Sequence, residues 1–249
     1  MNLLPQTLEQ MYSVGYSLNQ RAERVKFDDS ISRDEALAIG RILEDIKAVN
    51  TLETGVASGA STLVICHYHK LSGHAGSRHY GVDPNQMSQY GGAALENLKR
   101  ENSDQYFQLL EGPSHLKIPE LIQDKISIDF ALIDGWHTFD YTLVDFFLVD
   151  KILRKGGIVA FHDMYGSAKQ KVLGFIKTHR KYELADEYLV KGNESFKKTL
   201  KFFIWRIYKN PKLLFSSYHW RYQLKNSSGL LFLKKLENFE PPYNFYHSF

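Results

Sequence analysis

The chain has 249 residues, of which 43% are hydrophobic, and its formal net charge is only +3. This length fits one elaborated α/β domain with a sizeable core. The single cysteine, Cys66, excludes a disulfide framework and indicates a reducing compartment. Residues 1–20 have neither a basic start nor a continuous apolar run, and no charge-free apolar stretch is long enough to span a membrane. We therefore expect a cytoplasmic protein.

From residue 32 to residue 163 the sequence alternates between helical and strand patterns. Ser32 and Glu35 have the spacing of a capping box, which predicts that a helix begins there. Strands are predicted at residues 49–53, 79–83, 106–111, 129–134 and 158–163, with helices between them, and two later strands at 182–190 and 229–237. Strands separated by helices imply right-handed βαβ units, and hence a mostly parallel sheet covered by helices on both faces.

The chain divides into four predicted parts. Residues 1–30 are an N-terminal segment that we expect to contact the substrate or a second subunit, and residues 31–190 form the core. Residues 191–228 are a basic, aromatic insertion, and residues 229–249 supply the last strand and a tail.

An acidic residue stands at the end of each of the first five predicted strands: Glu53, Asp83, Glu111, Asp134 and Asp163. In parallel α/β sheets, ligands bind beyond the carboxyl ends of the strands. Periodicity does not require acidic residues at these positions, so the strand ends are where we expect the functional site.

Residues 53–62 read "ETGVASGAST" and connect the first strand to a helix. A dinucleotide-binding loop would need G-x-G-x-x-G, but Gly55 and Gly59 are four apart and Ala57 occupies the position of the second glycine. A P-loop is excluded because no Gly-Lys-Ser or Gly-Lys-Thr follows.

The charges around this loop favour a zwitterionic ligand. Glu53 could serve a cationic group, while backbone N–H groups and the hydroxyls of Ser61 and Thr62 could serve an anionic one. S-adenosylmethionine has such an amino-acid end. Asp83 lies 24 residues after Gly59, close to the offset expected of a ribose-binding acid.

With these motifs in order, residues 31–165 resemble the class I S-adenosylmethionine-dependent methyltransferases. The resemblance rests on "ETGVASGAST", "GVDPNQ", "LLEGPSH", "ALIDGWHTFDY" and "LRKGGIVAFHD". The last two look most like the small-molecule O-methyltransferase branch, which includes catechol-, macrocin- and cephalosporin-type enzymes. The resemblance implies a Rossmann-like, doubly wound α/β fold with a mostly parallel seven-stranded sheet, an antiparallel last strand and a basic helical insertion before it.

The resemblance also implies roles for individual residues in cofactor binding. The methionine end would contact the loop from Glu53 to Ser61, the ribose would contact Asp83, and the adenine would lie beside Ser114. Asp134 and His137 would lie near the sulfonium. The implied cofactor-binding set is Glu53, Gly55, Ala57, Gly59, Ser61, Asp83, Ser114, Asp134 and His137.

Methylation of a hydroxyl benefits from a general base or a metal ion, because a neutral hydroxyl is a poor nucleophile. We expect His137 to act as the base and Asp163 to orient it or to bind a metal, with His162 as a further catalytic candidate. Asp134 and Asp163 could together bind Mg²⁺. The resemblance supports a metal only in part, since the related metal-dependent enzymes carry an Asp-Asn pair where this chain reads "FHDM". The alternative is that His162 and Asp163 only pair with each other or cap a neighbouring loop.

The stretch "CHYHKLSGHAGSRHY" contains one cysteine and several histidines, which raises the question of a zinc site. Their spacing does not complete a known zinc pattern, so we assign them to a helix end and a loop instead. The residues concerned are Cys66, His67, His69, His74 and His79.

Residues 191–235 contain eleven Lys and Arg residues and a single acid, Glu194. Residues 196–215 have the pattern of an amphipathic helix. Three interpretations stay open: a helix packed on its own domain or on a second subunit, a peripheral contact with an anionic membrane, or an arm for an acidic substrate such as a glycan. Nucleic acid is a less favoured partner.

The leading functional prediction is methylation of a hydroxyl on a small molecule or a sugar-containing product. An N-methyltransferase of the same fold and a cofactor-binding scaffold without turnover are the alternatives. A nucleic-acid amino group is not the expected target, because "IDGW" stands where such enzymes have "[DN]-P-P-[YF]".

Overall fold

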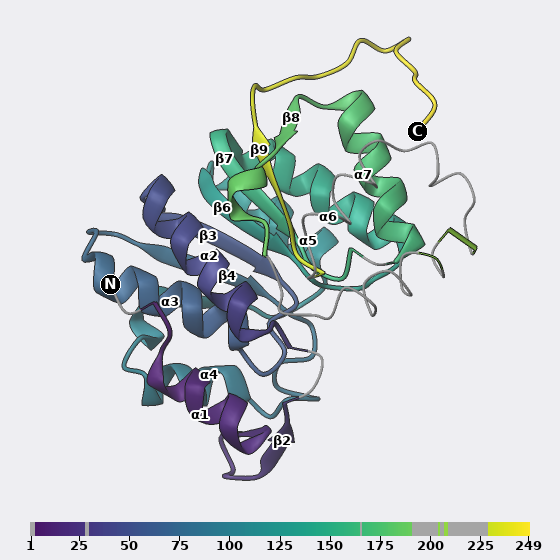
Figure 1. Cartoon of the computed structure of the whole chain (residues 1–249). Coiled ribbons are helices and arrows are strands. Elements are labelled where there is room, and N and C mark those ends of the chain that lie inside the picture. The colour runs from purple at the N-terminus through teal and green to yellow at the C-terminus, as the bar shows by residue number, and fades with distance from the viewer. Residues whose placement is uncertain (1–2, 28–29, 165, 191–203, 205–206, 209–228) are drawn as a thin grey trace.

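The computed structural model describes residues 3–27, 30–164, 166–190, 204, 207–208 and 229–249. Seven strands form one sheet in the order β5-β4-β3-β6-β7-β9-β8 (Figure 1). The strands are β3 (Asn50–Thr54), β4 (Arg78–Val82), β5 (Phe107–Leu110), β6 (Ile128–Ile133), β7 (Leu153–Phe161), β8 (Tyr182–Leu184) and β9 (Leu231–Lys235). The first five pair in parallel, and β9 runs antiparallel to both β7 and β8. The prediction of a mostly parallel seven-stranded sheet with an antiparallel last strand is confirmed.

Helices cover both faces of this sheet, as the alternation of patterns predicted (Figure 1). Buried side chains of the first four helices form the core on one face, and those of the last three form it on the other. The helices are α1 (Gln6–Val14), α2 (Arg33–Ile46), α3 (Ala60–Ser72), α4 (Ala93–Arg100), α5 (Ser114–Gln123), α6 (Phe139–Ile152) and α7 (Ser167–His179). None of the helices among these residues is both long and apolar enough to cross a membrane.

Helix α2 begins at the predicted capping box. The backbone N–H of Ser32 donates to Glu35 Oε2 at 2.8 Å, and the N–H of Glu35 donates to Ser32 Oγ at 3.4 Å. After this cap, Ile39, Ile42 and Leu43 are fully buried in the core on one face of the sheet. The cap and the apolar stripe therefore fix both the start of α2 and the face that it buries.

Some boundaries differ from the sequence predictions. Strand β7 begins at Leu153, before the predicted start at residue 158, and therefore includes Gly156 and Gly157. The strand accommodates these glycines through a positive φ of 79° at Gly156 and a register shift of its pairing between Ile128 and Phe130. The predicted strand at 182–190 is shorter and ends at Leu184.

The N-terminal segment folds onto the core through elements that the sequence reading did not assign. Helix α1 contacts α3, and the hairpin of β1 (Tyr16–Leu18) and β2 (Arg24–Lys26) contacts α4. The N–H of Gln20 donates to the carbonyl of Gly91 at 3.1 Å. This segment is therefore part of the same folded unit as residues 31–190.

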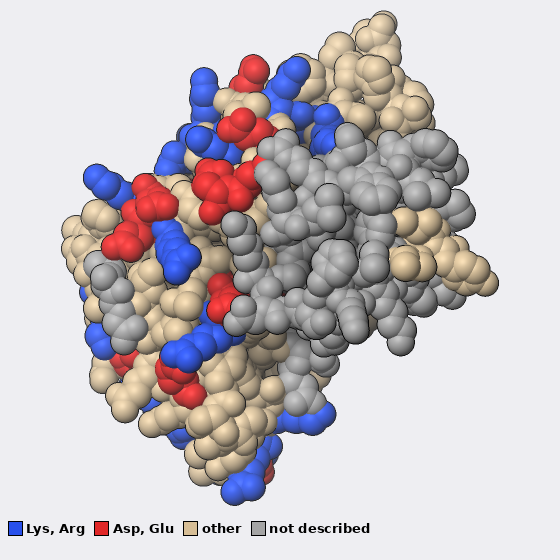
Figure 2. Space-filling view, in the orientation of Figure 1, with Lys and Arg blue, Asp and Glu red and all other residues tan. Residues whose placement is uncertain are grey.

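The predicted insertion at 191–228, including the amphipathic pattern at 196–215, lies almost entirely outside the described residues. Among the basic residues counted over 191–235, Lys235 is buried in β9 and donates to the carbonyl of Leu153 at 3.0 Å. Lys235 is therefore a structural residue and not part of a solvated basic face. On the face shown in Figure 2, acidic and basic side chains of the described residues are interspersed.

Candidate active site

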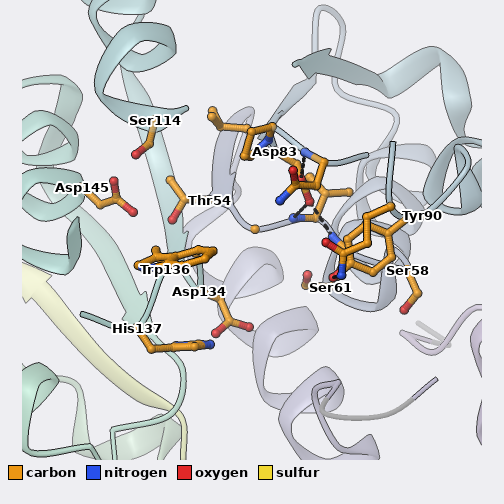
Figure 3. A pocket seen from close by; sticks show the side chains of 18 of the residues that line it. Thr54, Ser58, Ser61, Asp83, Tyr90, Ser114, Asp134, Trp136, His137 and Asp145 are labelled. Carbon is orange, nitrogen blue, oxygen red and sulfur yellow. Dashed lines mark hydrogen bonds between the residues drawn. The ribbon is translucent and has the colours of Figure 1, made fainter. Parts of the chain in front are cut away.

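A cavity of about 840 Å³ lies at the carboxyl edge of the parallel strands (Figure 3). This volume is in the range typical of small-molecule sites. Residues that follow β3, β4, β5, β6 and β7 all contribute to the wall, which places the predicted strand ends around one space. The predicted site residues in the wall are Gly55, Ala57, Ser61, Asp83, Ser114, Asp134, His137 and Asp163.

The loop between β3 and α3 needs glycine at both predicted positions. Gly55 has a φ of 84°, and a Cβ there would lie 2.3 Å from the carbonyl oxygen of Asp134. Gly59 has a φ of 88°, and a Cβ would lie 2.8 Å from that of Ala94 on α4. The loop is therefore packed tightly between the β6 end and α4. Gly59 caps α3 without a side-chain hydrogen bond, so the start of this helix offers N–H groups to an anion.

Asp83 holds this loop from the end of β4. Its Oδ2 accepts hydrogen bonds from the N–H groups of Val56 at 3.0 Å and Ala57 at 2.9 Å, while its Oδ1 accepts from the N–H of Asn85 at 2.7 Å. Ala57 adopts a left-handed conformation with a φ of 48°. Asp83 thus both lines the cavity and fixes the backbone beside it.

Glu53 occupies a different place from the one expected of a residue that contacts a ligand directly. Its side chain is fully buried beneath the wall, where it accepts hydrogen bonds from the hydroxyls of Ser61, at 2.5 Å, and Thr62. The alternation of a strand accounts for this position. Thr54 points into the cavity, so Glu53 points to the opposite face, toward α3.

His137 and Asp163 lie together in the cavity wall, from the loops after β6 and β7. His137 Nε2 is 3.7 Å from Asp163 Oδ2, and both side chains are about half exposed. Burial and then the ammonium of Lys169 lower the pKa of His137, against the opposing effect of Asp134 and Asp163. At neutral pH the imidazole is therefore mostly in its basic form.

His162 lies behind the cavity wall. Its Nδ1 is 3.2 Å from Asp134 Oδ2 and 3.8 Å from Asp163 Oδ1, and its Nε2 is 3.6 Å from Glu35 Oε2. Burial alone would lower the pKa of His162, but the carboxylates of Asp134 and Glu35 raise it to about 10. The imidazolium form is a poor general base at neutral pH, which favours an electrostatic role for His162. Its nearest carboxylate is Asp134, so the alternative of an exclusive pair with Asp163 does not describe this arrangement.

Two charged residues beside His162 were missed by the sequence analysis as parts of the site. Glu35 was identified only as a helix-capping residue, and Lys169 on α7 gave no signal because nothing in its local pattern indicates burial. Lys169 is 2% exposed; its Nζ donates to the carbonyl of His162 at 2.6 Å and lies 3.9 Å from Asp134 Oδ1. Burial lowers the pKa of Lys169.

A third missed residue, Asp145 on α6, lines the cavity near Ser114 and Thr54 (Figure 3). Burial raises the pKa of Asp145, while the hydroxyls of Ser114 and Thr54 oppose the rise. The sequence placed Asp145 inside a predicted helix, and only the packing of α6 against the sheet brings it to the cavity.

Asp134, His162 and Asp163 each offer a ligand atom, and these atoms lie within 4.8 Å of one another. Among the residues that the structure describes, this is the one such cluster of three or more His, Cys, Asp or Glu side chains. It includes both predicted metal ligands, Asp134 and Asp163.

The order of the sheet, the antiparallel β9 and the glycine loop at its carboxyl edge define the Rossmann-like fold of class I S-adenosylmethionine-dependent methyltransferases. Residues 52–164 match the family model described as a methyltransferase domain. The chain therefore has the fold of this class, and residues 52–164 are similar to a methyltransferase domain. No curated protein matches the chain by sequence.

Solved structures with this fold include several O-methyltransferases. One from Bacillus cereus, in complex with S-adenosylhomocysteine (SAH), is 16% identical with a TM-score of 0.59, covering 73% of this chain and 83% of the other. A putative O-methyltransferase from Klebsiella pneumoniae is 14% identical, with a TM-score of 0.58 and coverages of 74% and 82%. TomG from Streptomyces achromogenes, in complex with S-adenosylmethionine and involved in tomaymycin synthesis, is 12% identical, with a TM-score of 0.59 and coverages of 73% and 82%.

Proposed function

We propose that this protein transfers a methyl group from S-adenosylmethionine to a hydroxyl of a small molecule. One observation carries the proposal: the glycine loop, Asp83 and the pair of His137 and Asp163 face a single cavity. The resemblance of the fold to O-methyltransferases supports the same reaction.

The residues in the wall fit the parts of this cofactor. The start of α3 offers N–H groups for a carboxylate, and Asp83 offers a carboxylate edge for ribose hydroxyls. Ser114 supplies a polar surface and Trp136 an aromatic surface for the adenine of the cofactor. When bound, S-adenosylmethionine supplies an activated methyl group on its sulfonium.

The protein's own contribution is to orient the acceptor and to remove its proton. His137 is partly exposed in the cavity and mostly basic at neutral pH, so it can take the proton of a hydroxyl that lies beside it. Asp163 is close enough to stabilise the imidazolium that then forms. Walls on several sides of the cavity hold the acceptor in line and limit the access of water.

Mg²⁺ is a further component of this proposal. Asp134 Oδ1 is buried without a hydrogen-bond partner among the described residues, and the carboxylate of Asp163 lies close by. Two carboxylates fit the donor preference of Mg²⁺. When bound there, the ion would lower the pKa of an acceptor hydroxyl.

The N-terminal segment is proposed to contribute to acceptor binding. Lys26, Ser30 and Ile31 reach the cavity wall from β2 and from the segment before α2. This placement supports the expectation that residues 1–30 contact the acceptor.

The test combines binding with turnover in the whole protein. Calorimetry should show stoichiometric binding of S-adenosylmethionine, and a labelled-methyl assay against small-molecule and glycan fractions should show transfer to base-stable, hydroxyl-derived ethers. Binding without transfer to any fraction would support the scaffold alternative, and transfer to amines would support the N-methyltransferase. Absence of binding would contradict both enzymatic alternatives.

A further inference from the structure

A chain of buried hydrogen bonds runs from the interior of the protein to the cavity wall. It connects His69 on α3, Thr51 and Glu53 on β3, His79 on β4, and Ser61 at the start of α3. Each of these side chains is at most 7% exposed, and only Ser61 lines the cavity. The proposed methyl-transfer mechanism does not use the two histidines.

The distances along this chain are those of ordinary hydrogen bonds. His69 Nε2 lies 2.9 Å from Thr51 Oγ1, which lies 3.0 Å from His79 Nδ1. His79 Nε2 lies 3.0 Å from Glu53 Oε1, and the Ser61 hydroxyl donates to Glu53 Oε2 at 2.5 Å. The chain is therefore continuous from α3 to the cavity.

The direction of the protons follows from the chemistry of the groups. An ionised carboxylate only accepts, so His79 must present its N–H at Nε2 to Glu53. The Thr51 hydroxyl lies between His69 Nε2 and His79 Nδ1, and it also donates to the carbonyl of Arg78 at 3.4 Å.

The far end of this series of hydrogen bonds is His69. His69 Nδ1 has no hydrogen-bond partner in the part of the chain that the structure describes, as expected for the bare nitrogen of a neutral ring. Burial lowers the pKa of His69 to about 3, which keeps that ring neutral. The two donors nearest the cavity, His79 Nε2–H and the Ser61 hydroxyl, both point toward Glu53.

The same logic decides what Ser61 offers to the cavity. Its only hydroxyl proton is donated to Glu53, so Oγ presents lone pairs to a ligand. We propose that His79 is a positioning residue that, through Glu53, fixes Ser61 as a hydrogen-bond acceptor for the ammonium group of the bound cofactor. The proposal rests on the proposed function. It changes the expected role of Glu53: instead of contacting the cofactor directly, Glu53 orients the Ser61 hydroxyl.

The test compares two ligands that differ only in the ammonium group: SAH and its deamino analogue, in which hydrogen replaces the amino group. Calorimetry on the full chain gives the ratio of their dissociation constants. In the wild type, the loss of a hydrogen bond from a charged donor should weaken binding by about tenfold to one-hundredfold. In Ser61→Ala this ratio should fall by about tenfold, because the variant lacks the Oγ that accepts from the ammonium group.

Variants of the buried chain separate positioning from simple destabilisation. His79→Gln retains an N–H donor for Glu53 and should keep the wild-type ratio. His79→Phe removes the donor, favours a protonated Glu53 that donates to Ser61, and should reduce the ratio. Thr62→Val removes another donor to the same Glu53 oxygen, so it should reduce the ratio in the same direction, and His79→Gln is the matched control for His79→Phe.

A wild-type ratio in Ser61→Ala would overturn the proposal, even if His79→Phe fails to fold. A ratio in His79→Gln as low as that in His79→Phe would also overturn it, because general loosening around Glu53 would then explain the effect. Failure of the wild type to bind SAH at all would instead contradict the proposed function, and the inference with it.

Discussion

The carboxylate of Asp83 accepts a hydrogen bond from the backbone N–H of Ala57 at 2.9 Å, across the gap between the ends of β4 and β3. Ala57 holds a positive φ of 48°, a conformation that disfavours residues with a Cβ. The bond therefore stabilises a strained loop on the wall of the cavity. Asp83 links the shape of the glycine loop to the cofactor position that we propose.

The first prediction follows from this double role. Asp83→Ala should remove both the anchor of the loop and the contact to ribose, and should weaken S-adenosylmethionine binding by at least about one-hundredfold. Asp83→Asn retains a carbonyl oxygen for the loop but loses the negative charge, so its loss of S-adenosylmethionine affinity should be smaller. Calorimetry measures the affinity of both variants. Glu111→Gln is the control, because Glu111 also follows a strand but does not line the cavity; an equal loss in Glu111→Gln would count against a specific role of Asp83.

The second prediction concerns proton removal by His137. His137→Ala should retain cofactor binding and lose turnover by about one-hundredfold to ten-thousandfold, the usual contribution of a general base. His74→Ala is the control variant, because His74 is exposed in the loop after α3 and does not line the cavity. Full activity of His137→Ala would remove His137 from the mechanism.

The pH dependence gives a separate measure of the same group. Because burial lowers the pKa of His137, its basic form should persist below the usual range of histidine. In the wild type, kcat/KM should therefore fall only at a pH below about 6.5 on the acid side. That acid limb should be absent from the residual activity of His137→Ala, and an unchanged limb would assign it to another group.

The sequence predicted the sheet and the strand-end acids because both depend on local patterns. Alternating patterns indicate parallel βαβ units, and parallel strands bring Asp83, Asp134 and Asp163 to one edge. The burial of Glu53 could have been anticipated from the alternation of β3, since Thr54 takes the cavity side.

Lys169 and Asp145 could not be predicted, because they reach the site through the packing of α7 and α6 on the sheet. Likewise, the sequence placed His69 and His79 in one cluster but could not show that both contact Thr51. That contact depends on the register between β3 and β4, in which Thr51 lies opposite His79. Long-range register is set by tertiary packing and not by spacing along the chain.

The third prediction concerns the metal. If Asp134 and Asp163 bind Mg²⁺, EDTA should reduce methyl transfer strongly, and added Mg²⁺ should restore it. Binding of S-adenosylmethionine, followed by calorimetry in the same samples, should change little, because its contacts lie mostly on the loop and Asp83. Full turnover after thorough EDTA treatment would show that His137 works without a metal.

The fourth prediction is a dependence of stability on pH caused by His162. The pKa of His162 is about 10 in the folded protein, above the ordinary value of about 6.5 expected in the unfolded chain. The folded state therefore binds more protons between these two values, so the stabilisation is complete below about pH 6.5 and is lost as the pH rises toward 10.

Urea unfolding at pH 7, 8 and 9 should show this loss as a decline of up to about 1.4 kcal/mol per pH unit in the difference between the wild type and His162→Gln. The difference isolates His162 from other groups that titrate in the same range. His74→Gln, which changes an exposed histidine, should keep a constant difference from the wild type. A constant difference for His162→Gln as well would mean that Asp134 and Glu35 do not hold His162 in its charged form.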